Sequence, residues 1–392
     1  MLVEKMKKIK IARIVTVPIV YTHILDLLSF LDGSDQFELH LICSEGPYLS
    51  DLRLKFKNSI IHIIPISREI NLKSDLASLW RLYELFRKEK FDIIHSHTPK
   101  AGLISSMAGF LSMIRIRLHT FTGQVWVNLS GPKKSLLILL DRLITFLNTM
   151  NYTDSFGQKK FLMEHGVGNE KSLAVIHKGS LGGINAERFS PEKLHQKILD
   201  KKGEIFPDYN GKILLYLGRI NKDKGLRELW EAFKILHPQH RLQLLLVGPV
   251  ETLDDVNFKI LIEEMQKSPD VKFINFTSEP EVYLGLCDIF CFPSYREGFG
   301  TVALEASAME KPVVASNIYG LSEAVEDRKS GLLFEVYNSQ DLSLKLEELI
   351  TNENFAKDLG RYGRERVLID FTDRILTEKM IAEYFRLIKK YE

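Results

Sequence analysis

The sequence predicts an α/β protein made of two doubly wound units in series, and three observations support this fold class. The chain has 392 residues, more than the size at which one hydrophobic core usually stops growing. Short β-branched segments alternate with longer helical patterns throughout. The strands are continuously apolar, which is typical of parallel sheets covered by helices on both faces. Two such sets in series therefore predict two doubly wound sheets.

Each half of the chain repeats the same rhythm of apolar strands and amphipathic helices. In the first half the predicted strands are 9–17, 37–43, 60–66, 91–97, 114–121 and 172–178, and the clearest helices are 76–90 and 136–150. In the second half the predicted strands are 212–218, 242–248, 271–276, 288–294, 312–316 and 331–335. The helices there are 226–237, 257–266, 301–310 and 341–350.

A polar, charged stretch without a clear strand, residues 185–211, marks the boundary between the two units. We therefore predict an N-terminal Rossmann-like domain over 1–190 and a C-terminal one over 191–374. Residues 375–392 form one more amphipathic helix with no strand after it, and this helix can pack back on the N-terminal domain.

The composition is that of an ordinary globular protein. A net charge of +2 without a long Lys/Arg run argues against nucleic-acid binding, and three cysteines without histidine neighbours fit core packing in a reducing compartment. The most apolar segment, 135–147, carries Asp141 and Arg142 and is too short to span a bilayer. We expect a cytoplasmic protein that is either soluble or associated with a membrane surface.

The stretch "SYREGFGTVALEASAMEKPVVAS" (294–316) carries the strongest chemical signal. It is predicted as strand end, glycine turn, helix and next strand, and such turns lie at the carboxyl ends of parallel strands, where ligands bind. Gly298 and Gly300 let backbone amides approach an anion, and the following helix directs its positive end to the same place. Glu305 shares a helix face with apolar residues, so it needs donors: backbone amides, a basic side chain or ligand hydroxyls. A structural, ion-paired glutamate is the alternative.

A second signal follows the first strand of the C-terminal domain, in "LYLGRINKDKGLRELW". Arg219 and Lys224 lie just past the strand end. Two cations combined with a glycine turn and a helix N-terminus form a suitable site for a diphosphate. Taken alone, the two side chains would be interpreted as solvated surface charges.

These stretches together resemble the retaining nucleotide-sugar glycosyltransferases of family GT4, which have the GT-B fold of two Rossmann-like domains facing each other across a cleft. "EGFGTVALEASAMEKPVVAS" is similar to the E-x7-E signature, and "GRINKDKG" to the G-R-x4-K-G segment. "LLLVGP" and "KGSLGGINAERFSP" agree in order, and "HSHTPKAG" and "HTFTGQVW" resemble bacterial capsule and O-antigen transferases.

The resemblance implies a donor site in the C-terminal domain. Arg219 and Lys224 would neutralise the departing nucleoside diphosphate, Glu297 would hold the transferred sugar, and Glu305 would hold the ribose. The remaining donor-binding positions would be Gly218, Gly298, Phe299, Gly300 and Thr301. The sugar would pass through an oxocarbenium-like state and keep its anomeric configuration. No metal or other cofactor is expected, because the two cations take that role.

The N-terminal domain would then hold the acceptor. His97 is expected to border the cleft, and Lys100 can meet an acceptor phosphate. Many family members place a histidine directly before the glycine of the next loop, whereas this chain has Thr122 before Gly123. Trp126, Lys133, Lys134 and the apolar run to Leu147 can form a basic, aromatic surface beside a membrane, with ordinary helix packing as the alternative.

The predicted function is therefore sugar transfer from a nucleoside-diphosphate donor, with UDP favoured, to a glycan or polyprenyl-diphosphate-linked acceptor in polysaccharide biosynthesis. Two alternatives stay open at this point. The same fold serves nucleotide-sugar epimerases, and a transferase-like chain can instead act as a non-catalytic subunit that activates a partner. The E-x7-E pair with Arg219 and Lys224 argues against both.

Overall fold

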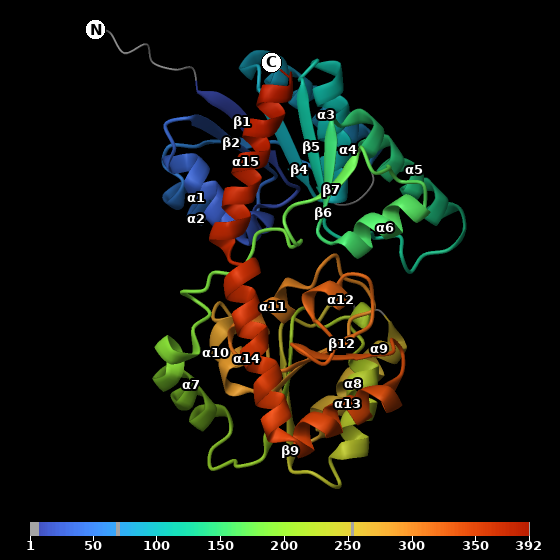
Figure 1. Ribbon diagram of the computed structural model, residues 1–392. Coiled ribbons are helices and arrows are strands. Elements are labelled where there is room, and N and C mark those ends of the chain that lie inside the picture. Colours follow the sequence, from blue (N-terminus) through green and yellow to red (C-terminus); the bar gives the residue numbers. More distant parts are fainter. Residues whose placement is uncertain (1–7, 68–70, 252–254, 392) are drawn as a thin grey trace. The chain divides into compact units, whose positions relative to one another are not determined.

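The computed structural model describes residues 8–67, 71–251 and 255–391, and it divides into two compact units (Figure 1). Unit 1 contains the chain up to Gly183 together with the segment that starts at Asp373, and unit 2 is Ile184–Thr372. The division falls before the sequence-based boundary at 190/191 and close to the one at 374/375. The C-terminal helix thus belongs to unit 1.

Unit 1 is built on a seven-stranded sheet in the order β3-β2-β1-β4-β5-β6-β7, with every neighbouring pair parallel. Its strands are β1 (Ile9–Ile14), β2 (Phe37–Cys43), β3 (Ile60–Ile63), β4 (Ile93–His97), β5 (Ile116–Phe121), β6 (Met150–Thr153) and β7 (Leu173–Val175). Its helices are η1 (Pro18–Ile24), α1 (Leu25–Gly33), α2 (Leu49–Lys55), α3 (Leu72–Glu89), α4 (Pro99–Leu111), α5 (Gly131–Leu147), α6 (Phe156–Glu164) and α15 (Asp373–Tyr391).

The two faces of this sheet have separate cores, because successive side chains of a strand point to opposite faces. Ile11 of β1 packs with residues of α1 and α15, including Tyr384, whereas Ala12 and Ile14 pack with residues of α3 and α4. Figure 1 shows α15, in red, running beside α1, in blue, and the two helices are in contact. The final helix therefore covers one face of the first sheet.

Unit 2 has a six-stranded parallel sheet in the order β10-β9-β8-β11-β12-β13. Its strands are β8 (Lys212–Leu217), β9 (Leu242–Val247), β10 (Val271–Ile274), β11 (Ile289–Phe292), β12 (Val313–Ser316) and β13 (Gly331–Phe334). Its helices are α7 (Pro191–Ile205), η2 (Lys222–Lys224), α8 (Leu226–Leu236), α9 (Val256–Lys267), α10 (Pro280–Leu286), α11 (Thr301–Ala308), α12 (Leu321–Ala324), α13 (Ser339–Thr351) and α14 (Glu353–Asp370). The strand order reverses between β8 and β11, which is the switch point where ligands of such folds bind.

The fold class is confirmed: all twelve predicted strands are present, and both sheets are parallel. One detail of the prediction is wrong, and one strand was not predicted. The helix predicted over 136–150 ends at Leu147, and the strand β6 begins at Met150. The polar stretch 185–211 contains the helix α7, of which no residue is fully buried. None of the described helices combines the length and the hydrophobicity that a transmembrane span requires.

Candidate active site

The turn between β11 and α11 has the geometry that its glycines predict. Gly300 has φ +83°, a conformation that favours glycine, and a Cβ there would lie 2.3 Å from Leu321 Cδ2. The helix α11 starts at the next residue, Thr301, and the strand β12 follows it. The predicted sequence of strand, glycine turn, helix and strand is therefore confirmed.

The loop after β8 is ordered by hydrogen bonds within it, and it lies against the residues that follow β11. The hydroxyl of Tyr216 donates to the carbonyl of Arg219 (2.7 Å), and the amide of Asp223 donates to the side chain of Asn221 (3.2 Å). Gly225 has φ +63°, and a Cβ there would lie 1.9 Å from the carbonyl oxygen of Pro293. Only glycine permits this approach, which places Lys224 beside the turn that carries Glu297.

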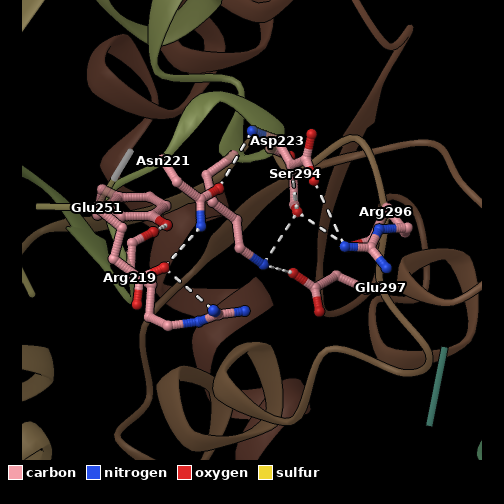
Figure 2. Close-up of polar contacts among 9 residues, drawn as sticks. Arg219, Asn221, Asp223, Glu251, Ser294, Arg296 and Glu297 are labelled. Carbon is pink, nitrogen blue, oxygen red and sulfur yellow. Dashed lines mark hydrogen bonds and ion pairs between the residues drawn. The ribbon is translucent and has the colours of Figure 1, made fainter. Parts of the chain in front are cut away.

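Lys224 and Glu297 form an ion pair (Nζ to Oε1, 2.5 Å), and both side chains are largely buried, with exposed fractions of 15% and 18%. The lysine also lies 3.4 Å from the hydroxyl of Ser294 and 6.0 Å from the centre of the Phe292 ring. Figure 2 shows the polar contacts around this pair. This mostly desolvated pair holds the lysine ammonium group in a fixed position at the carboxyl ends of β8 and β11, which is the ligand-binding edge of the sheet.

Arg219 lies on the same loop but is more exposed. Its guanidinium pairs with Glu251 (3.1 Å), which also accepts a hydrogen bond from Asn221 (3.3 Å). The exposed fractions of 58% and 36% indicate a weak surface ion pair that a ligand phosphate can replace. Glu251 was missed by the sequence analysis, although it closely follows the "LLLVGP" motif. Arg296 was missed as well; it pairs with Asp223 at 3.4 Å.

Glu305 lies on α11 and is half-buried, and no described residue donates a hydrogen bond to its carboxyl group. Burial of the carboxyl raises its pKa to about 7, with Arg188 opposing the shift and Glu281 adding to it. Arg188 is itself paired with Glu281 (2.8 Å). The structural alternative, an ion-paired glutamate, thus finds no direct partner here. The structure joins Lys224 to Glu297 by direct contact and gives no such contact between Glu305 and either of them.

In unit 1, the predicted acceptor residues lie at the carboxyl ends of β4 and β5. His97 is the last residue of β4 and is buried against the guanidinium of Arg13. Lys100, in the first turn of α4, pairs with Asp75 (2.7 Å). Thr122 and Gly123, together with Asp141 of α5, line a small cavity of about 10 Å³.

Of the two interpretations of Trp126, ordinary packing is confirmed and a place on the surface is wrong. Its side chain is 1% exposed, and its indole N–H donates to Asp141 Oδ2 (2.7 Å). The aromatic ring fills a core between α5 and α6 because its polar edge finds a buried carboxyl partner. Asp141 accordingly belongs to the packing of this domain, and burial raises its pKa to about 6.

Comparison with known proteins places this fold in a known class. The model of "Glycosyltransferase Family 4" matches residues 20–150, and that of "Glycosyl transferases group 1" matches residues 198–366. A glycosyltransferase structure from Rickettsia africae ESF-5 superposes with a TM-score of 0.79 at 21% identity, over 98% of this chain and 99% of the other. Anabaena Alr3699/HepE in complex with UDP and glucose gives a TM-score of 0.77 at 19% identity, over 96% and 99%. The two parallel-sheet units therefore have the GT-B architecture of glycosyltransferases.

Sequence relatives show the family. The capsular polysaccharide biosynthesis glycosyltransferase CapM of Staphylococcus aureus is 32% identical over 99% of this chain and 100% of its own length. An Escherichia coli UDP-Gal:alpha-D-GlcNAc-diphosphoundecaprenol alpha-1,3-galactosyltransferase is 25% identical over 93% of each. The chain belongs to the GT4-like glycosyltransferases, and it is a glycosyltransferase enzyme. Membership supports the transferase interpretation over the epimerase and subunit alternatives.

Proposed function

We propose that this enzyme transfers a sugar from a UDP-sugar to a lipid-diphosphate-linked acceptor in polysaccharide biosynthesis, with retention of the anomeric configuration. The observation that carries the proposal is the Glu305 carboxyl group, which has no described hydrogen-bond donor although burial raises its pKa. Such a group on a helix next to the glycine turn is suited to accept hydrogen bonds from the vicinal hydroxyls of a ribose.

The residues around Glu297 can stabilise the negative charge of a departing diphosphate. Lys224 is held by Glu297 and Ser294, and Arg219 lies five residues before it on the same loop. A lysine fixed in a poorly solvated place stabilises developing negative charge without reorganising. The amides of Gly300 and Thr301, at the positive end of α11, add to this field. Glu297 would bind the sugar hydroxyls, and this proposal needs no metal or other cofactor.

Names of the relatives support the choice of donor and acceptor. The Escherichia coli relative uses UDP-Gal and a diphosphoundecaprenol-linked GlcNAc, and a Campylobacter jejuni relative, 30% identical over 53% of each chain, also has a diphospho-undecaprenol acceptor. We extend both features to this chain, with the N-terminal unit holding the acceptor. The expected place of action is the cytoplasmic face of the cell membrane.

Nucleotide binding provides the direct test. In a thermal-shift experiment with UDP, GDP and ADP, UDP is expected to stabilise the protein most, because ligand that binds only the native state adds about 2.7 kcal/mol at 100 times Kd. The assay needs no knowledge of the sugar or the acceptor. A protein that melts at the same temperature with and without all three nucleotides would contradict the proposed donor site.

Contact with a membrane is proposed for the outer face of α5. Leu136, Leu139 and Phe146 share one side of this helix and are 49%, 59% and 79% exposed, and the exposed Lys133 lies at its first turn. An apolar stripe with a basic residue at one end suits an anionic lipid surface.

The double variant Leu139→Ser/Phe146→Ser is expected to reduce co-sedimentation with phosphatidylglycerol vesicles by roughly 10-fold, because it removes apolar area that the lipid would bury. Leu344→Ser is the matched control, since Leu344 is 60% exposed but lies on α13 of the other unit. Equal sedimentation of the double variant and the wild type would exclude α5 as the contact.

A further inference from the structure

A small cavity of about 20 Å³ lies within unit 1, at the carboxyl edge of its sheet. Its lining includes Arg13 near the end of β1, His97 at the end of β4, and Asp154 directly after β6. Ser180, in the loop that follows β7, and Thr377 of α15 are among the other polar residues that line it. Residues of several parallel strands thus converge at the edge where ligands of such sheets bind.

Arg13 is fully buried without a carboxylate partner among the described residues. Its guanidinium contacts His95 Nδ1 (3.1 Å), the hydroxyl of Tyr384 and Nε2 of His97. Burial, and secondarily the charge of Arg13, lower the pKa of both histidines well below the usual value, so the rings are neutral. Because Nε2 of His97 accepts from Arg13, the ring proton of His97 must be on Nδ1.

Four polar atoms of the residues that line this cavity have no hydrogen-bond partner within the described structure: Arg13 Nε, His97 Nδ1, Asp154 Oδ1 and Ser180 Oγ. The four residues are 0%, 1%, 6% and 6% exposed. Buried polar groups are normally satisfied, so four unsatisfied ones around one cavity indicate a missing polar occupant. Two of them are N–H donors and one is a carboxyl oxygen.

We propose that this cavity binds a hydroxyl oxygen, supplied by a sugar of the acceptor during transfer and by water when no acceptor is bound. The proposal rests on the function proposed above, in which the N-terminal unit holds the acceptor. A hydroxyl oxygen accepts from Arg13 Nε–H and His97 Nδ1–H, and its own proton is donated to Asp154. The volume suits one oxygen atom and is too small for a phosphate group.

Two further observations favour a ligand over a permanently trapped water. Leu181 and Gly182, which also line the cavity, are partly exposed, so the cavity wall reaches the surface. Ser180 has φ +74°, which is uncommon for a residue other than glycine, and its amide donates to the carbonyl of Asp154 (2.7 Å). Strained residues of this kind gather at ligand sites.

The test is acceptor kinetics with the full-length enzyme. Transfer of radiolabelled sugar from UDP-sugar is measured into increasing amounts of a lipid extract from the source organism. Burial raises the pKa of Asp154 to about 8, so its carboxyl group is largely uncharged at neutral pH. Asp154→Ala is expected to lower kcat/KM for the extract about 10-fold, because a buried hydrogen bond to the acceptor hydroxyl is lost. Asp154→Asn, which keeps an acceptor oxygen, should recover most of the activity, and Ser180→Ala should lose less than Asp154→Ala.

Ser106→Ala is the matched control, because Ser106 is fully buried and its hydroxyl is also unpartnered, but it lies on α4 and does not line the cavity. Stabilisation by UDP should be the same in every variant, so a failure of the donor site is recognised separately. Unchanged acceptor kinetics in both Asp154→Ala and Ser180→Ala would overturn the proposal and leave a structural water only. If Asp154→Ala does not fold, the acceptor kinetics of Ser180→Ala and Asp154→Asn provide the test instead.

A crystal structure without acceptor should show one water in the cavity, and an empty cavity would also overturn the proposal.

Discussion

Lys224→Ala is expected to lower transferase activity by at least about 100-fold and to abolish stabilisation by UDP. The lysine is the least exposed cation of the proposed donor site, and it is fixed by Glu297 and Ser294. Its removal also leaves the mostly buried carboxylate of Glu297 without its partner, so a diphosphate would meet an uncompensated negative charge. Both effects act in the same direction.

The matched control for this variant is Lys222→Ala. Lys222 lies two residues earlier on the same loop, is 62% exposed and is 3.9 Å from Asp255, so its removal should change activity little. Initial rates and thermal shifts with UDP are measured for both variants. Wild-type rates and an undiminished UDP shift in Lys224→Ala would show that the diphosphate binds elsewhere.

Glu305→Gln is expected to weaken UDP binding by about 10-fold or more, because a neutral amide oxygen accepts from ribose hydroxyls less strongly than a carboxylate. The same change should stabilise the nucleotide-free protein at neutral and higher pH. Burial raises the pKa of Glu305 to about 7, so the folded state resists its ionisation more than the unfolded state does. The variant therefore separates binding from stability.

The pH dependence follows from the direction of that shift. Below about pH 4.5 the group is protonated in both states, and wild type and variant should melt alike. As the pH rises through about 7, the wild type loses stability that the variant keeps, so the difference in melting temperature grows in favour of Glu305→Gln. Melting curves of both proteins without nucleotide from pH 5 to 8.5 measure this. A difference that is constant with pH would mean that Glu305 is not held in a poorly solvated place.

The sequence predicts the parts of this protein that depend on local patterns. Continuous apolar strands gave both parallel sheets, and the spacing of Gly298 and Gly300 gave the start of α11. The strand β6 was missed because its residues, "MNYT", are mostly polar. The buried side-chain amide of Asn151 donates to the backbone carbonyl of Ser172, which lies 21 residues later in the chain. The residues of β6 alone do not indicate such a partner, so they do not predict a buried strand.

The missed site residues depend on contacts between distant parts of the chain. Tyr384 contacts Arg13 from the opposite end of the sequence, and Arg188 lies close enough to Glu305 to affect its pKa. The residues next to Arg13 and Glu305 in the sequence give no indication of these distant partners. Of the residues Arg13, Tyr384 and Arg188, Arg13 is the one with a signal in its own segment, because a charged residue in a buried apolar strand needs polar partners.

The assignment of α15 to the first unit has a consequence for how the protein is made. Met380, Ile381, Tyr384 and Leu387 complete a core whose other members are synthesised from the first residues of the chain onward. While the ribosome is still producing unit 2, the part of this sheet face that α15 covers stays exposed, and it presents apolar surface. A fragment that stops at Gly183 would remain in that unfinished state, and adding residues 373–391 as a separate peptide is the natural way to complete it.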